Sequence, residues 1–409
     1  MKNKLSRKST ILLATGFVDG RGGSKMCSWF YDEMVDRGYK VLVATNSMYK
    51  YKLNELKLKC DVVIHMTPED SFESIYKKCE EGLKNIQFDY MVSMGWRTYW
   101  PYIAYKRKIP YIMVDGGIPV NYDKYPAPFI KEVYADTKLF LMTTWFDWMA
   151  PENKIIPKIK VVTQPYPYKR VEEMRKIRNK PKEYFREIVA TKFPEIRDYE
   201  YDLMVYLNLS DAYVDPFNFG PNNRNFVDPW GHQMADYMAQ NEIEPSLFFL
   251  FKLIAAFETN YPGKVLIYLM QEKTKFISDP IVKMCKKVKT IATSGLDIKM
   301  DPLIKKAADV NICRATNCDN QADLSLIGEP TVTSVVPRNY MDEDTAAIQA
   351  EKLGICYQIQ YDDPNYMQKL KEYVDDKNNF ASMSKKTAEV FEKFWKNNNF
   401  WEELFRVIG

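Results

Sequence analysis

Two polar segments in the C-terminal half of the sequence each follow a short apolar run and precede a predicted helix. The run Val310–Cys313 is followed by RATNCDN, which begins with Arg314, and the run PTVTSVVP is followed by RNYMDED, which contains Asp342 and Glu343. The N-terminus of a helix presents free N–H groups and a partial positive charge, and an arginine adds a full charge. Such segments favour an anionic ligand such as a diphosphate, and they predict a ligand site at the ends of two neighbouring strands.

The elements that must position these segments alternate regularly. In the N-terminal half the apolar run 11–15 precedes a glycine-containing segment and then residues 26–38, whose apolar side chains recur at helical spacing. The pattern restarts at residues 201–210 (YDLMVYLNLS), and residues 279–291 (DPIVKMCKKVKTI) are predicted to be helical. Strands that alternate with helices form parallel sheets covered on both faces. The sequence therefore predicts an α/β fold with two Rossmann-like, doubly wound domains.

The length of 409 residues indicates two domains, because one compact core rarely grows so large. We expect an N-terminal domain over 1–165, a crossover linker over 166–200, a C-terminal domain over 201–385 and a final helix over 386–409 that packs back on the N-terminal domain. The linker is charged and interrupted by prolines, which favours a surface helix, with a basic binding helix as the alternative. For the final helix, the alternative is binding to a partner. Two such domains would enclose an interdomain cleft with ligand loops on both sides.

Four loops at predicted strand ends of the N-terminal domain are candidates for binding or catalysis, because ligands of such sheets bind at the carboxyl ends of the strands. The first loop is rich in glycine but has neither the G-x-G-x-x-G pattern of a dinucleotide site nor the G-K-[ST] of a P-loop. The four loops are Gly16–Ser24, His65–Asp70, Gly95–Arg97 and Asp115–Pro119.

The composition argues against several functional classes. A formal net charge of +4 is too small to require a nucleic-acid partner. The seven cysteines lack the spacing of a zinc site, and the chain has only two histidines, His65 and His232, so we predict no metal site. We find no secretory signal and no apolar stretch near the roughly 18 residues of a membrane span. These features, with reduced cysteines, predict a cytoplasmic protein.

The C-terminal domain resembles the GT-B class of nucleotide-sugar glycosyltransferases in three segments. The segment IKMDPLIKKAADVNI is similar to the stretch of that class in which a helix precedes Ala-Asp-Val. DLSLIGEPTVTSVVP is similar to E-A-L-x-x-G-x-P, and DEDTAAIQAEKLG to D-Q-x-x-N-A-x-x-x-E-x-L-G. The N-terminal domain shares only the general layout. The resemblance implies transfer of a sugar from a nucleoside diphosphate-sugar, with UDP-sugars as the expected donors, to an acceptor hydroxyl, and it implies no further cofactor.

The resemblance also implies roles for individual residues of the donor site. Asp323 falls where the family has the glutamate that binds the ribose hydroxyls, and a carboxylate that accepts two hydroxyl donors suits that task. Asp342 and Glu343 fall where the family's Asp-Gln pair contacts the sugar. Residues 342–344 also spell D-x-D, a form typical of metal-dependent enzymes, but their register is that of the sugar-contacting pair, so we expect a metal-independent reaction.

The phosphate-binding motif departs from the family pattern. Ala315 and Thr316 fall near the family's His-Gly-Gly, and the histidine is missing. Arg314 stands beside this point and can supply the charge that the diphosphate requires. Helix N-termini and this arginine, rather than a metal, would then stabilise the leaving group.

The resemblance places the general base and the acceptor in the N-terminal domain. The first loop offers Asp19 as the residue that deprotonates the acceptor, and Asp115 is the second candidate; for both, a turn-forming aspartate before glycine is the structural alternative. The residues expected to line the acceptor loops are Gly22, Gly23, Trp96 and Arg97. Aromatic residues stack on sugars, flat small molecules and nucleobases alike, so the acceptor class stays open.

Two other functions are compatible with the same pattern. A UDP-sugar 2-epimerase shares the fold but needs several carboxylates and a histidine around the sugar, and this chain has few histidines. A degenerate GT-B subunit would bind a ligand or a partner without chemistry, and the missing phosphate-motif histidine favours it. Turnover of a donor would separate the transferase from the degenerate subunit.

Overall fold

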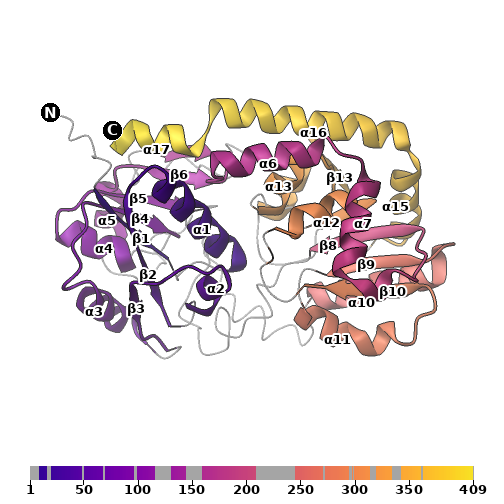
Figure 1. The fold of residues 1–409 in the computed structure, drawn as a ribbon, viewed down its shortest axis with the longest axis horizontal. Coiled ribbons are helices and arrows are strands. Elements are labelled where there is room, and N and C mark those ends of the chain that lie inside the picture. The colour runs from indigo at the N-terminus through magenta and orange to yellow at the C-terminus, as the bar shows by residue number, and fades with distance from the viewer. Residues whose placement is uncertain are drawn as a thin grey trace. The chain divides into compact units, whose positions relative to one another are not determined.

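The chain divides into two compact units, each built around a parallel sheet (Figure 1). The first unit comprises Met1–Tyr168, Ala212–Ala239 and Phe394–Gly409, and the second comprises Lys169–Asp211 and Gln240–Lys393. The computed structural model describes residues 9–15, 20–47, 50–67, 70–95, 99–115, 130–143, 159–208, 245–269, 272–293, 297, 299–313, 319–333, 342–360 and 363–408.

In the described part of the first unit, seven strands pair in parallel in the order β3-β2-β1-β4-β5-β6-β7. Residues 11–14 of the central β1 are all fully buried apolar residues, as expected for a parallel strand that is covered on both faces. The strands are β1 (Thr10–Ala14), β2 (Lys40–Asn46), β3 (Val62–Ile64), β4 (Tyr90–Met94), β5 (Tyr111–Asp115), β6 (Phe140–Thr143) and β7 (Ile159–Val162).

Helices pack on this sheet through large aromatic side chains. Tyr76 of α3 and Trp100 of α4 belong to one core cluster with Leu12 and Met91 of the central strands. The indole Nε1 of Trp100 donates a hydrogen bond to the carbonyl oxygen of Thr15 at 3.1 Å, which ties α4 to the carboxyl end of β1. The helices of this unit are α1 (Gly20–Asp36), α2 (Lys50–Glu55), α3 (Phe72–Gly82), α4 (Tyr99–Lys106), α5 (Ile130–Asp136) and α17 (Phe400–Ile408).

The C-terminal helix α17 packs against α1. Trp401 is fully buried, its ring lies 5.4 Å from that of Phe30, and its Nε1 donates to the carbonyl oxygen of Tyr166 at 2.7 Å. The N–H of Thr163 donates to the carbonyl oxygen of Asn398 at 3.0 Å. The end of the sequence therefore completes the core of the first unit.

In the described part of the second unit, six strands pair in parallel in the order β10-β9-β8-β11-β12-β13. The strands are β8 (Leu203–Asn208), β9 (Val265–Leu269), β10 (Val288–Ala292), β11 (Val310–Cys313), β12 (Thr331–Thr333) and β13 (Cys356–Gln358). The helices are α6 (Tyr168–Arg178), α7 (Lys182–Lys192), η3 (Pro194–Ile196), α10 (Pro245–Asn260), α11 (Glu272–Val282), α12 (Asp301–Ala307), α13 (Asp319–Leu326), α14 (Asp342–Lys352), α15 (Tyr366–Asp375) and α16 (Lys377–Asn397), and α16 crosses the boundary between the units.

The two faces of the second sheet differ in chemistry. Leu203, Val205 and Leu207 of β8 pack with α10 and α15 in an apolar core. Because successive side chains of a strand point to opposite faces, Tyr206 points to the other face. There Lys305 of α12 lies over its ring, 5.4 Å from the centroid. One face is therefore an ordinary apolar core, and the other contains buried polar groups.

The structure confirms the α/β class and corrects two local predictions. Residues 288–292 form the edge strand β10, paired in parallel with β9, rather than the end of a helix. Val288, Thr290 and Ala292 lie on one face of this strand, and the exposed Lys289 lies on the other face, so the lysine fits the alternation of a strand. The helix α1 begins at Gly20, so Gly22 and Gly23 lie in its first turn and not in a loop. The first turn of a helix tolerates glycine, since its N–H groups have no intrahelical partner in any case.

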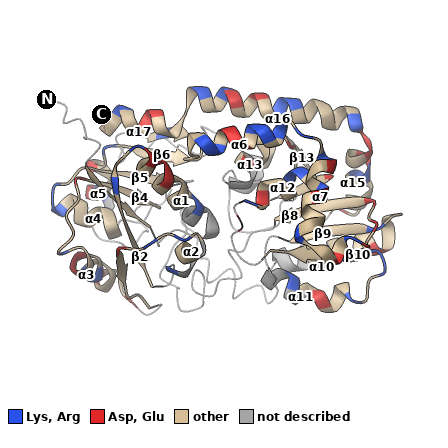
Figure 2. Ribbon diagram, in the orientation of Figure 1, with Lys and Arg blue, Asp and Glu red and all other residues tan. Residues whose placement is uncertain are grey.

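The charged segment after the first unit is paired rather than uniformly basic. Figure 2 shows Lys and Arg mixed with Asp and Glu along α6 and α16. Arg175 and Arg178 of α6 both contact Glu392 of α16, with N–O distances of 2.7 and 2.5 Å. These contacts favour a structural role for α6. Among the described residues, no helix combines the length and apolar character that crossing a membrane requires.

Candidate functional site

Each sheet reverses its winding direction at one point. In the first sheet β1 lies between β2 and β4, and in the second sheet β8 lies between β9 and β11. In open α/β sheets, ligands bind beside the carboxyl ends of the strands at such a point. In the second unit these strands end at Asn208 and Cys313, both of which are buried. The carboxyl ends of β8 and β11 are therefore the candidate site of this unit.

Three buried charged side chains lie beside the carboxyl end of β11. The ammonium Nζ of Lys305 is 2.6 Å from Asp301 Oδ2 and 3.0 Å from Asp323 Oδ2. The side chain of Lys305 is fully buried, and those of Asp301 and Asp323 are 9% and 4% exposed. Asp301 begins α12, Lys305 follows one turn later, and Asp323 belongs to α13, which follows β11 in the chain. We name Asp301, Lys305 and Asp323 the carboxylate–lysine cluster.

Two tyrosines of the sheet extend this cluster. The hydroxyl of Tyr206 donates to Asp301 Oδ1 at 2.8 Å. The ring of Tyr206 stacks on that of Tyr268 with centroids 5.4 Å apart, and the hydroxyl of Tyr268 is 2.7 Å from Thr293 Oγ1. Burial raises the pKa of both tyrosines, so both hydroxyls stay protonated. The carboxylate of Asp301 is therefore held by Tyr206 of the sheet and by Lys305 of its own helix.

Electrostatics keeps the ammonium of Lys305 charged. Burial by itself lowers the pKa of Lys305, but the carboxylates of Asp301 and Asp323 outweigh burial and raise it on balance. Burial raises the pKa of the neighbouring Cys313 thiol to about 12, with Lys305 acting in the opposite direction. Since Cys313 is the last residue of β11, its interaction with the cluster places the three charges at the carboxyl edge of the sheet.

The structure places some of the other predicted site residues, and the rest lie outside the described residues. Asp342 and Glu343 are the first two residues of α14, so their backbone lies at a helix N-terminus. In the first unit, Asp115 is the last residue of β5 and pairs in register with Met142 of β6, at the carboxyl edge of that sheet. His65 follows β3 and is exposed. The predicted site residues outside the described residues are Asp19, Trp96, Arg97, Arg314, Ala315 and Thr316, and His232 is outside them as well.

The sequence contains a signal for the cluster that our sequence analysis missed. Asp301 and Lys305 are four residues apart and therefore lie on one face of a helix, where opposite charges attract. That spacing predicts the pair but says nothing about Asp323, which is distant in sequence. Among the residues whose side chains the structure describes, no group of three or more His, Cys, Asp or Glu side chains is arranged to hold a metal ion.

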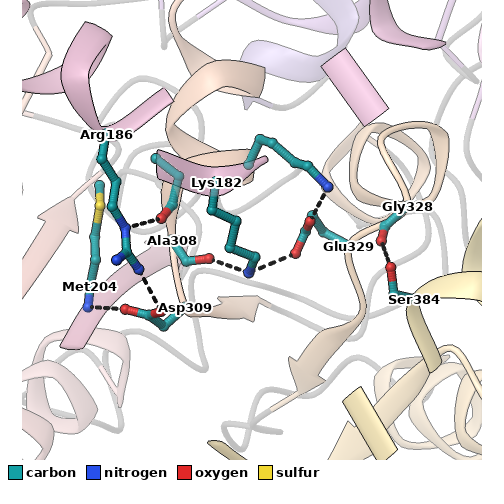
Figure 3. A network of polar contacts seen from close by, with 10 residues as sticks. Lys182, Arg186, Met204, Ala308, Asp309, Gly328, Glu329 and Ser384 are labelled. Carbon is teal, nitrogen blue, oxygen red and sulfur yellow. Dashed lines mark hydrogen bonds and ion pairs between the residues drawn. The ribbon is translucent and has the colours of Figure 1, made fainter. Parts of the chain in front are cut away.

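A second polar network lies at the opposite edge of the same sheet (Figure 3). Glu329 precedes β12 and contacts Lys306 of α12 and Lys182 of α7, with N–O distances of 2.6 and 3.1 Å. Asp309 precedes β11, pairs with Arg186 of α7 at 2.5 Å and accepts from the N–H of Met204 at 2.8 Å. We name this set the amino-edge network. It joins α7 to the starts of the strands and lies away from the carboxyl ends where ligands bind.

Comparison by sequence identifies no relative: no family model matches, and no characterised protein matches. Comparison of structures finds proteins of similar fold. The chain is similar to the Staphylococcus aureus MnaA in its UDP co-structure, with a TM-score of 0.59, 12% identity and 97% of both chains covered. It is similar to the spinosyn rhamnosyltransferase SpnG, with a TM-score of 0.57, 13% identity, and 94% of this chain and 96% of that chain covered.

A third similar structure is the Methanocaldococcus jannaschii UDP-GlcNAc 2-epimerase in complex with UDP-GlcNAc and UDP. Its TM-score is 0.55 at 15% identity, with 94% of this chain and 99% of that chain covered. At such identities the likeness shows the fold alone. The match spans nearly the whole length of each chain and includes both units. The chain therefore has the GT-B fold, which glycosyltransferases and UDP-GlcNAc 2-epimerases share.

Proposed function

We propose that this protein binds a nucleoside diphosphate-sugar, with a UDP-sugar as the expected donor, and transfers the sugar to an acceptor hydroxyl. The observation that carries the proposal is the environment of Asp323, a buried carboxylate contacted by Lys305 beside the strand end where GT-B sheets bind ligands. An ionised carboxylate has about four acceptor sites and can accept from several donors at once, which suits the two hydroxyls of a ribose.

The rest of the proposed donor site follows the same edge of the second sheet. The diphosphate would lie at the N-terminus of α13, with Arg314, Ala315 and Thr316 beside it. Helix N–H groups and an arginine stabilise the negative charge that develops on the leaving diphosphate, so the step needs no metal. Asp342 and Glu343 at the start of α14 would contact the sugar.

The acceptor would bind to the first unit. A carboxylate must take the proton of the acceptor hydroxyl as the bond between sugar and diphosphate breaks. Asp115 at the end of β5 and Asp19 are the two candidates, with Gly22, Gly23, Trp96 and Arg97 as the proposed acceptor surroundings. The acceptor would be a glycan, a small molecule or, less in keeping with the net charge of +4, a nucleic-acid base.

A second candidate is epimerisation of the UDP-sugar, since several similar structures are UDP-GlcNAc 2-epimerases. The two reactions differ in a simple way. A transferase consumes the donor only when an acceptor is present, apart from slow hydrolysis, and releases UDP. An epimerase converts UDP-GlcNAc into a second UDP-sugar without any acceptor. Proton NMR of the purified protein with UDP-GlcNAc, with and without acceptor candidates, distinguishes the two.

The donor site is tested by thermal unfolding with a panel of nucleoside diphosphates and their sugars. A ligand that binds only the folded chain stabilises it by about 2.7 kcal/mol at a concentration of 100 Kd, which shifts Tm by several degrees. We expect UDP and UDP-sugars to raise Tm, and Asp323→Asn to remove most of that shift. If no nucleotide raises the Tm of the wild-type chain, the proposal is wrong and the degenerate subunit becomes the better interpretation.

Asp309→Asn is the matched control for Asp323→Asn. Both aspartates pair with a cation in the second unit, but Asp309 belongs to the amino-edge network. Both substitutions should destabilise the chain, and only Asp323→Asn should weaken nucleotide binding. Equal loss of binding in both variants would show that general destabilisation, rather than the site, causes the loss.

A further inference from the structure

We infer that Lys305 is a positioning residue for nucleotide binding, because its buried ammonium fixes the Asp323 carboxylate that accepts the ribose hydroxyls. This inference rests on the proposed function and adds a residue to the donor site. Lys305 would not touch the ligand and would act through Asp323. The argument depends on where the ammonium lies, what fixes it, and which carboxylate it contacts.

The ammonium of Lys305 has a fixed position. Its side chain is fully buried, its Nζ is 2.6 Å from Asp301 Oδ2, and it lies over the ring of Tyr206. Asp301 is itself fixed by the hydroxyl of Tyr206. A long, flexible lysine side chain is therefore confined between α12 and β8. Its contact to Asp323 at 3.0 Å connects that carboxylate to the rigid sheet.

A fixed carboxylate binds hydroxyls better than a mobile one. Ordering a side chain on binding costs free energy, and an acceptor that is ordered in advance avoids that cost. The attraction of the same ammonium also offsets part of the cost of burying this carboxylate, whose side chain is 4% exposed. Hydrogen bonds to a charged acceptor are among the strongest in proteins. Removal of the ammonium should therefore weaken the recognition of ribose in particular.

The neighbouring Lys306 provides a matched control within the same helix. It is also buried and ion-paired, at 2.6 Å, but its partner is Glu329 in the amino-edge network. The two lysines are adjacent in sequence and similar in burial and pairing. They differ in the edge of the sheet at which their partner carboxylates lie. An effect on ribose recognition that appears for one lysine and not for the other cannot come from lost stability alone.

The test compares the affinities for UDP and for 2′,3′-dideoxy-UDP by titration calorimetry. In the wild-type chain, two hydroxyl contacts to a charged acceptor should favour UDP by roughly 10- to 100-fold. Lys305→Met, which preserves the approximate length of the side chain and removes its charge, should reduce this ratio to within about threefold of one. Lys306→Met should leave the ratio at its wild-type value, although it lowers stability.

Each result decides between defined alternatives. If wild-type UDP binding is present and Lys305→Met keeps the full preference for ribose, the inference is overturned and the proposed function stands. Absence of UDP binding to the wild-type chain overturns both. If Lys305→Met does not fold, Asp301→Asn replaces it, because this variant weakens the anchoring of the same ammonium. It should lower the preference in the same direction, and an unchanged ratio would count against the inference.

Discussion

At the residue scale, the second unit contains two buried ion-pair clusters with opposite placements. The carboxylate–lysine cluster lies beside the carboxyl end of β11, and the amino-edge network lies beside the strand starts. Buried ion pairs contribute little net stability on average, because desolvation offsets their attraction, but breaking one leaves a costly unpaired charge. The chemistry of the two clusters is similar. Their positions in the fold, rather than their residue types, decide which of them is a candidate for ligand binding.

Replacement of Glu329 tests the structural role that we assign to the amino-edge network. The Glu329 side chain is 1% exposed and contacts two ammonium groups, so Glu329→Gln should leave both without a compensating charge. We expect a loss of about 3 kcal/mol in the free energy of unfolding, measured by urea denaturation. Nucleotide affinity should stay within about twofold, since the network lies away from the carboxyl edge.

Glu81 is an exposed, ion-paired glutamate and serves as the control for the buried Glu329. It pairs with Lys84 at 3.6 Å, and its side chain is 76% exposed. Glu81→Gln should change the free energy of unfolding by less than about 0.5 kcal/mol, because water screens the pair. A similar loss in both variants would contradict the assignment of Glu329 to a buried, structural position.

At the element scale, the C-terminal helix α17 is part of the first unit's core. Its tryptophan is buried against α1, and its indole N–H has a partner in the segment that follows β7. Amphipathic helices at chain ends often fray unless tertiary contacts fix them. The contacts of Trp401 are of this kind, and they fix α17 to the first unit.

Two substitutions at Trp401 separate packing from hydrogen bonding. Trp401→Phe keeps an aromatic ring beside Phe30 but leaves the carbonyl of Tyr166 without this donor, for an expected loss of about 1–2 kcal/mol. Trp401→Ala also opens a cavity and should cost about 3–5 kcal/mol in total. Urea unfolding of both variants measures the two losses. Equal values would show that the hydrogen bond carries the whole contribution, contrary to our description.

At the scale of the whole molecule, the cysteines report which parts of both units are closed to solvent. Cys313 and Cys356 of the second unit are buried and have pKa values raised to about 12 by burial, so their thiols are neutral at pH 8. Cys60 and Cys285 are partly exposed, although burial raises their pKa values as well. Thiolate is the reactive form, so reactivity should follow exposure.

Alkylation with iodoacetamide at pH 8, followed by peptide mass spectrometry, tests this pattern. Cys60 and Cys285 should react in the native chain, and Cys313 and Cys356 should react only after denaturation. Labelling of denatured protein serves as the control for peptide detection. Rapid native labelling of Cys313 would show that the carboxyl end of β11 is open to solvent, and it would remove the argument that the adjacent cluster is buried.

The sequence by itself determined the fold class. Apolar runs such as residues 11–14, followed by amphipathic stretches, require parallel strands and crossover helices. Asp323 was singled out by its place in a segment that resembles the GT-B class, and its role in a donor site stays a prediction. Local pattern reaches no further than one element and its neighbours. It misplaced the start of α1, and it missed the edge strand β10, which lies partly within the helix predicted over residues 279–291.

Only the tertiary structure decided which charges meet. Lys305 and Lys306 are adjacent in sequence, yet one contacts Asp323 and the other Glu329, because a helix turns successive side chains by about 100°. Asp323 and Asp301 are brought together by the packing of α12 and α13 beside β11, and no local pattern specifies that distance. Contacts through space depend on how elements pack, and the arrangement of this buried cluster is therefore a property of the folded chain.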